Sequence, residues 1–136
     1  MNRFVAGILL LGVAAPLTGQ AADPNLALAR RVLRTTPLVD GHNDLPWRIR
    51  EDSVARGDVE RYDLRTRTPG HTDLARLKQG MVGAQFWSIY IPGEIRDSGY
   101  ARVQLEQFDI ARRVIAKYPE VLQWTPTAAA VRRAFA

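Results

Sequence analysis

The stretch Leu38-Val39-Asp40-Gly41-His42-Asn43-Asp44 decides the fold and is the starting point for the rest of the chain. Two large apolar residues lead through a glycine into polar and ionisable side chains. An apolar run with this ending is typical of a short buried strand that passes into a loop. In α/β proteins, the loops after the strands carry the functional side chains. The stretch therefore predicts a sheet element and the place where its chemistry lies.

A second strand is predicted over 81–91, where apolar side chains occupy both faces of the extended chain. Burial on both faces is typical of a parallel strand covered by helices. Amphipathic helices are predicted around the two strands, at Asn25–Arg34, Asp73–Gln79 and Ala101–Lys117, with a last one opening at Thr125-Pro126. Strands that alternate with helices indicate an α/β architecture.

Two buried parallel strands do not make a closed sheet by themselves, so we expect residues 22–136 to be the N-terminal part of a larger domain, truncated before its third strand. Residues 48–67 carry many charges of both signs in alternation. Such a pattern predicts a solvated excursion between the strands.

The first residues predict a secretory signal peptide over 1–21. Asn2-Arg3 is followed by an uncharged, mostly apolar run over 4–15 and then by small residues up to a cleavage site after Ala21. The apolar run is shorter than the roughly 20 residues of a membrane span. We therefore expect export to a bacterial periplasm or to the exterior, with no stable membrane span after cleavage. An uncleaved N-terminal anchor is the alternative.

Composition excludes several classes of function. The chain has 136 residues, a formal net charge of +5 and no cysteine. The lack of cysteine excludes a disulfide scaffold, a thiolate metal site and a cysteine nucleophile. Arginines are interleaved with acidic residues instead of forming a basic stripe, so we expect no nucleic-acid partner. Net charge alone leaves nucleic-acid binding as an alternative without a motif.

His42 and Asp44 are the candidate metal ligands. Residues two apart in a strand face the same way, so these side chains are expected to project together. An imidazole nitrogen and a carboxylate oxygen suit zinc or a similar divalent ion. Asp40 shares this parity and is a candidate supporting partner for His42, and Trp47 is a candidate pocket residue. A polar turn after a strand is the alternative explanation of the same spacing.

The pattern His71-Thr72-Asp73 repeats this spacing in a different setting. It opens a predicted helix, where residues two apart do not share a face. Asp73 is better explained as a helix cap, with His71 as an ordinary surface residue. In the second strand, Gln85 needs a hydrogen-bond partner because its neighbours are apolar.

The segment Pro37-Leu38-Val39-Asp40-Gly41-His42-Asn43-Asp44-Leu45-Pro46-Trp47 closely resembles the signature of the membrane (renal) dipeptidase family of zinc peptidases. His71-Thr72-Asp73-Leu74, leading to Gly80-Met81-Val82-Gly83-Ala84-Gln85-Phe86-Trp87-Ser88-Ile89-Tyr90, resembles the next block of that family. The resemblance runs from about Leu26 to the end of the chain.

This resemblance implies a metal-dependent-hydrolase (β/α)₈ TIM-like barrel, of which this chain is an incomplete N-terminal portion. It implies a dipeptide substrate and two Zn²⁺ ions that share a bridging carboxylate, and it leaves a homodimer open. His42 and Asp44 match the metal ligands of the family's first strand. The remaining ligands and the catalytic residues are expected beyond residue 136.

We therefore expect the full-length parent to hydrolyse dipeptides with zinc, and the 136-residue chain to be inactive alone. Two alternatives remain. One is another amidohydrolase-type metal-dependent hydrolase on the same barrel, and the other is a secreted non-catalytic module.

Overall fold

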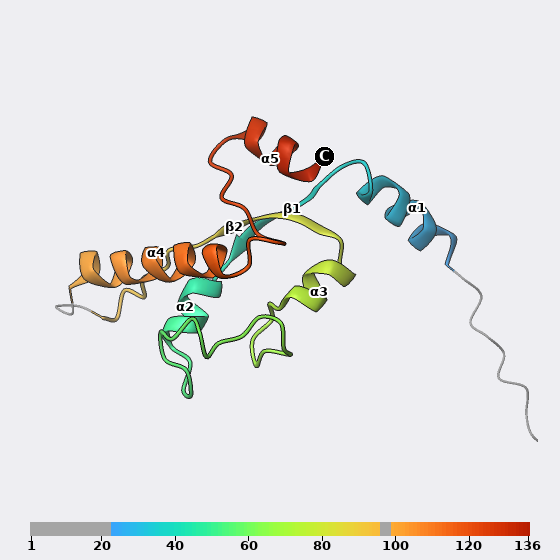
Figure 1. The fold of residues 1–136 in the computed structure, drawn as a ribbon. Coiled ribbons are helices and arrows are strands. Elements are labelled where there is room, and N and C mark those ends of the chain that lie inside the picture. Colours follow the sequence, from blue (N-terminus) through green and yellow to red (C-terminus); the bar gives the residue numbers. More distant parts are fainter. Residues whose placement is uncertain (1–22, 96–98) are drawn as a thin grey trace, which may run out of the picture.

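A computed structural model describes residues 23–95 and 99–136, and the predicted signal peptide lies outside them (Figure 1). Helices precede, separate and follow the two strands along the chain. Within the described residues, no helix combines the length and apolar character needed to cross a bilayer. The elements, in chain order, are α1 (Pro24–Leu33), β1 (Leu38–Asn43), α2 (Leu45–Arg50), α3 (Leu74–Gln79), β2 (Val82–Trp87), α4 (Tyr100–Lys117) and α5 (Ala128–Phe135).

The two strands pair in parallel, which confirms the predicted α/β class. Asp40 pairs with Gln85, and Asn43 pairs with Trp87, so β1 has one more residue than β2 between these pairs. The extra residue makes a β-bulge directly before the end of β1. β2 ends at Trp87, not at residue 91 as predicted, because its partner strand has already turned into α2.

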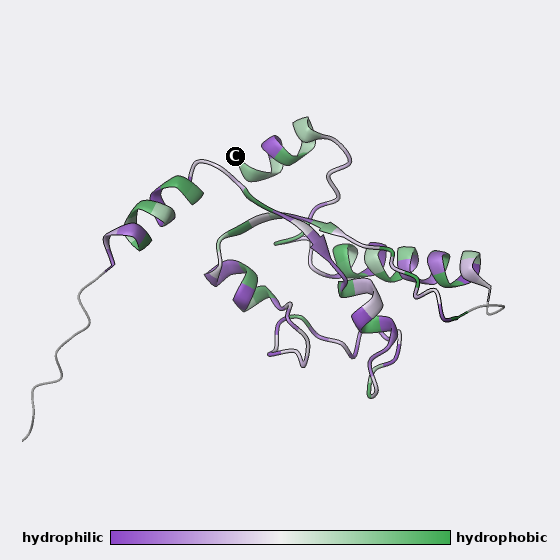
Figure 2. Ribbon diagram, turned by 180° about the vertical axis from the view of Figure 1, so that it is seen from behind, coloured by the Kyte–Doolittle hydropathy of each residue, from purple (hydrophilic) through white to green (hydrophobic). Residues whose placement is uncertain are grey.

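The strands are less covered than their apolar pattern predicts. Leu38, Val39 and Phe86 are 41%, 47% and 68% exposed. In Figure 2, hydrophobic residues lie along the strands and along α1, a helix that projects away from the sheet and none of whose residues is buried. α5 lies near the start of the strands, where a Cβ on Gly83 would come within 2.8 Å of Pro37 Cβ and 3.2 Å of Phe135 Cδ2.

The hydrophobic core lies beside the sheet and not between its strands and the helices. It joins α2 and α4 to the loop that follows α2. The loop was predicted to be a solvated excursion, and this prediction is wrong for its apolar residues. The charged side chains there turn mostly outward, while apolar residues between them turn into the core. The fully buried members of the core are Ile49, Val59, Leu64, Val114 and Tyr118.

The ends of the short helices follow local capping chemistry. The predicted cap of α3 is confirmed, because the Asp73 carboxylate accepts from the Arg76 amide at 2.8 Å. The last helix begins later than predicted, because Thr127 and not Thr125 provides its cap, accepting from the Ala130 amide at 3.1 Å. α2 was not predicted at all. It has only six residues, too few for an apolar period to be recognised.

Candidate functional site

His42 and Asp44 lie in contact at the carboxyl end of β1. The His42 Nε2 and Asp44 Oδ1 atoms are 3.0 Å apart, and the two side chains are 67% and 49% exposed. Asp44 is the residue before α2, yet its carboxylate makes no capping hydrogen bond to that helix. The Asn43 side chain accepts from the Leu45 amide at 3.0 Å instead. The Asp44 carboxylate is therefore left facing the imidazole and the solvent.

Asn43 fixes the end of the strand through its side-chain amide. Its Nδ2 donates to Thr72 Oγ1 at 3.0 Å, across 29 positions of sequence. Thr68 in turn donates from its hydroxyl to the Thr72 carbonyl at 2.8 Å. These bonds tie the end of β1 to the segment before α3. The segment that resembles the family's second block is thereby held beside the first.

Asp40 contacts the backbone of His42 and not its imidazole ring. Its Oδ1 accepts from the His42 amide at 3.1 Å, and its Oδ2 accepts from Gln85 Nε2 at 2.8 Å. The bond from the His42 amide is the main reason that the pKa of the Asp40 carboxyl is lowered, and Gln85 adds to it, while burial opposes both. Asp40 is therefore ionised in this position and acts as a double acceptor.

A hollow of about 330 Å³ opens beside the candidate ligands. Trp47 lies in its wall and makes an edge-on contact with Tyr90, with ring centroids 5.6 Å apart. The Arg50 guanidinium lies over the Trp47 ring, 5.3 Å from its centroid. The lining residues include His42, Asn43, Asp44, Leu45, Trp47, Arg48, Tyr62, Gly70, His71 and Thr72.

Several of the lining residues were not singled out as site residues from the sequence, among them His71, Arg48 and Tyr62. His71 was interpreted as an ordinary surface residue, yet it lines the same hollow as His42. Arg48 and Tyr62 come from the charged stretch, whose pattern carried no sign of a pocket. The Tyr62 hydroxyl is buried and has no hydrogen-bond partner within residues 23–95 and 99–136.

The pair of donors fits half of a zinc shell. Imidazole nitrogen and carboxylate oxygen are ordinary zinc ligands, and with bonds of about 2.0–2.1 Å two ligands of one tetrahedral ion lie roughly 3.3 Å apart. The observed separation of 3.0 Å is close to this value. Among the described residues, no group of three or more His, Asp and Glu side chains could hold a metal ion. His42 and Asp44 are therefore two side chains that would fit a four-coordinate zinc shell, and the described residues do not complete such a shell.

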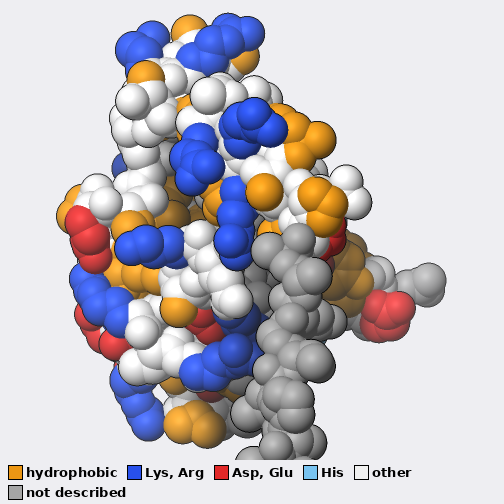
Figure 3. All heavy atoms as spheres, turned by 90° about the vertical axis from the view of Figure 1, so that its right-hand side faces the viewer, with side chains coloured by type: hydrophobic (Ala, Val, Ile, Leu, Met, Phe, Trp, Pro, Cys, Tyr) orange, Lys and Arg blue, Asp and Glu red, His pale blue; other side chains and the backbone are white. Residues whose placement is uncertain are grey.

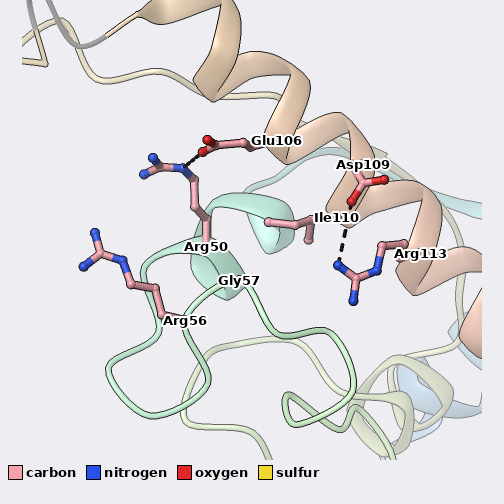
Figure 4. Close-up of a pocket in the computed structure, with 7 residues that line it drawn as sticks. All are labelled: Arg50, Arg56, Gly57, Glu106, Asp109, Ile110 and Arg113. Atoms are coloured by element: carbon pink, nitrogen blue, oxygen red, sulfur yellow. Dashed lines mark hydrogen bonds and ion pairs between the residues drawn. The ribbon is translucent and has the colours of Figure 1, made fainter.

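A second hollow, of about 300 Å³, lies between α4 and the segment around α2 (Figure 4). Arginines line it, but they face carboxylates. Arg50 Nε lies 3.1 Å from Glu106 Oε2, and Arg113 lies 3.7 Å from Asp109. Because these charges compensate one another, the second hollow is explained as the ion-paired seam between α2 and α4.

Comparison with known proteins agrees with the resemblance. The sequence profile of the family described as membrane dipeptidase (peptidase family M19) matches residues 26–136. Dipeptidase 3 of Mus musculus is 46% identical over 101 residues, which are 74% of this chain and 20% of the mouse protein. Dipeptidase 3 of Rattus norvegicus gives the same identity and coverage. The chain thus spans about a fifth of the length of these curated relatives.

Proposed function

Because this chain belongs to the membrane dipeptidase family, peptidase family M19, we propose that the protein containing it is a zinc-dependent dipeptidase. One observation carries the proposal. Inside the matched region, His42 Nε2 and Asp44 Oδ1 lie 3.0 Å apart at the carboxyl end of a parallel strand. In α/β barrels this end of the strands carries the active site.

In this proposal His42 and Asp44 hold zinc, with further ligands supplied from outside the described residues. Zinc, when bound there, would polarise the carbonyl group of the substrate and would lower the pKa of a bound water molecule. The chain's own residues shape the place where a dipeptide binds. Trp47 offers an apolar wall to it.

The proposal extends to the organisation of the whole protein. We infer that β1 and β2 are the first two strands of a (β/α)₈ barrel, that residues 1–21 direct export to a periplasm or the exterior, and that the 136-residue chain alone is inactive. The parallel pairing of β1 with β2 supports the first inference and the two-ligand site supports the third, while the export inference rests on the sequence pattern of residues 1–21. Dipeptide hydrolysis by the purified chain would contradict the last of them.

The test is His42→Ala in the full-length protein. Mutation of a residue that only hydrogen-bonds to a metal ligand weakens metal binding by roughly 10–100-fold. Loss of the ligand itself is expected to weaken zinc binding by more than this, with a parallel fall in kcat/KM. Zinc per protein is measured by mass spectrometry after dialysis, and hydrolysis is followed with a panel of dipeptides.

His71→Ala is the matched control, since it removes an imidazole from the same hollow and is expected to keep zinc bound. Unchanged zinc content in His42→Ala would contradict the proposal. Zinc binding without dipeptide cleavage would favour another metal-dependent hydrolase, and a protein that binds no zinc would favour a non-catalytic module.

A further inference from the structure

Gln85 stands out among the residues of β2 because it is a polar side chain with a partner on each side. Its Nε2 donates to Asp40 Oδ2 at 2.8 Å, and its Oε1 accepts from Trp87 Nε1 at 3.1 Å. Both its donor and its acceptor groups are therefore used. Trp87 itself packs against the hydrophobic core, so the amide of Gln85 is held from a rigid part of the molecule.

The hydrogen-bond chain ends at the backbone of a candidate zinc ligand. Asp40 uses one carboxylate oxygen for Gln85 and the other for the His42 amide, at 3.1 Å. Trp87, Gln85 and Asp40 thus form a continuous connection from the core to the His42 backbone. Within the described residues, this connection reaches His42 through its main chain and leaves its ring free to contact Asp44.

The connection crosses the β-bulge. Asp40 and Gln85 are the last regular pair before the extra residue of β1, and His42 lies inside the bulge. A bulge re-aims the side chains that follow it, and its extra residue is not held by the normal ladder. The local direction of the His42 side chain therefore depends on what fixes the bulge. The Asp40 carboxylate, held by Gln85, fixes it on one side, and Asn43, bonded to Thr72, fixes it on the other.

We propose that Gln85 is a positioning residue, which through Asp40 fixes the bulge at His42 and holds the His42–Asp44 pair in the geometry that binds zinc. This inference rests on the proposed function for the zinc, but the hydrogen-bond chain itself is independent of it. The competing explanation is that Gln85 only satisfies its own polar group in a half-buried strand.

A charge exchange separates the two explanations. Gln85→Glu places a second carboxylate opposite Asp40, which repels it and breaks the chain. Adding Asp40→Asn restores every bond, because the new amide donates to the new carboxylate, still accepts from the His42 amide, and leaves Trp87 its acceptor. Gln85→Met has a side chain of similar volume, removes both hydrogen bonds of Gln85 and adds no charge. It therefore still tests the proposal if the two facing carboxylates of Gln85→Glu unfold the protein.

The variants are made in the full-length protein, with Gln104→Ala on the exposed face of α4 as the matched control. Zinc affinity is measured by competition with a chelator, and ligand geometry by the visible absorption of the cobalt-substituted protein. We expect Gln85→Glu and Gln85→Met to weaken zinc binding by about 10–100-fold and to change the cobalt spectrum. We expect the double variant to recover most of the affinity, and Gln104→Ala to match the wild type.

Two results would overturn the proposal: wild-type zinc affinity in Gln85→Met, or a double variant no better than Gln85→Glu. Hydrogen exchange at the His42 amide, measured in the metal-free protein, tests the positioning role independently of the proposed zinc-dependent function. If the wild-type protein binds no zinc, the dipeptidase proposal fails, and faster His42 exchange in Gln85→Met than in Gln104→Ala still supports the positioning role. Equal exchange in these two variants would contradict that role.

Discussion

The Tyr118 hydroxyl joins two segments of the core. It accepts from the Leu64 amide at 2.8 Å and donates to Asp63 Oδ1 at 3.0 Å. The side chain is fully buried, and burial is the main reason that its pKa is raised. The hydroxyl therefore stays protonated and serves as both donor and acceptor, which fastens the loop after α2 to the end of α4.

Tyr118→Phe is expected to lower the free energy of unfolding by about 1–3 kcal/mol, because the buried Leu64 amide loses its acceptor. Urea denaturation followed by circular dichroism measures the change. Tyr100→Phe is the matched control, since its hydroxyl donates to the Gly93 carbonyl at an exposed site. Equal losses of unfolding free energy in the two variants would show that the buried Tyr118 hydrogen bond stabilises the fold no more than the exposed Tyr100 bond does.

For individual residues, the sequence predicted which side chains lie close together, but it did not predict which atoms of them form hydrogen bonds. The alternation of a strand places His42 and Asp44 on one side, and the structure has them in contact. The need of Gln85 for a partner also followed from its apolar neighbours. That Asp40 binds the His42 backbone and not its ring could not be predicted, because the bulge that allows it depends on the register with β2.

At the scale of the elements, β2 has no room for a side chain at Gly83. A Cβ there would lie 2.8 Å from Pro37 Cβ and 2.9 Å from Pro37 Cα. A proline ring and its backbone cannot move aside as a flexible side chain does. The absence of a side chain at Gly83 is therefore what lets the segment before β1 pass over β2.

Gly83→Ala is expected to destabilise the fold by about 1–3 kcal/mol, the usual cost of forcing an added methyl group into a packed site. Thermal unfolding measures it. Gly93→Ala is the control, because a Cβ at Gly93 meets nothing within 4 Å. A stability of Gly83→Ala equal to that of the control would mean that Pro37 yields without cost.

The long helix α4 was predicted most accurately, and of the two six-residue helices α3 was predicted and α2 was not. α4 runs from Tyr100 to Lys117, within one residue of its prediction at the start and with the same end. The strands were predicted because their apolar runs are dense. α2 and the buried residues of the following loop were missed, since their apolar positions are sparse and the charges between them dominate any local window.

At the scale of the whole molecule, hydrogen bonds from backbone amides stabilise several carboxylates. The main cause that lowers the pKa of Asp52, Asp63 and Asp73 is in each case a hydrogen bond from a backbone amide, from Ala55, Arg65 and Arg76 respectively. A carboxyl whose pKa is lower in the folded than in the unfolded state stabilises the fold while it is ionised. This contribution is complete above the unfolded pKa of about 3.9 and is lost as the pH falls through the lower folded values.

The folded state is therefore expected to lose stability steeply below about pH 4. Melting temperatures between pH 7 and pH 2 measure this loss. Asp52→Asn is expected to make the fall less steep, because the amide keeps an acceptor for Val54 and Ala55 but does not titrate. Asp109→Asn is the control, because Asp109 is an exposed carboxylate near Arg113 on α4. This variant is expected to keep the pH profile of the wild type. An unchanged slope in Asp52→Asn would contradict the role of that carboxylate.

The order of helices and strands in the sequence predicted the α/β class of the fold, but it did not predict where the hydrophobic core lies. Apolar strands predicted a sheet covered on both faces, but coverage depends on segments that a strand's own sequence does not specify. In the described residues Phe86 stays mostly exposed, and Figure 3 shows hydrophobic side chains at the surface between many Lys and Arg side chains. The core formed instead where α2, its loop and α4 meet.

The bond between Tyr118 and the Leu64 amide has a consequence for synthesis on the ribosome. The two residues are 54 positions apart in the chain. At the usual pace of about 5–20 residues per second, translation takes roughly 3–11 s to pass from one to the other. During that interval Val59 and Leu64 have emerged without the helix that buries them. A nascent chain of this protein therefore cannot complete its core before Tyr118 has been synthesised, and a translational pause within α4 would prolong the exposure.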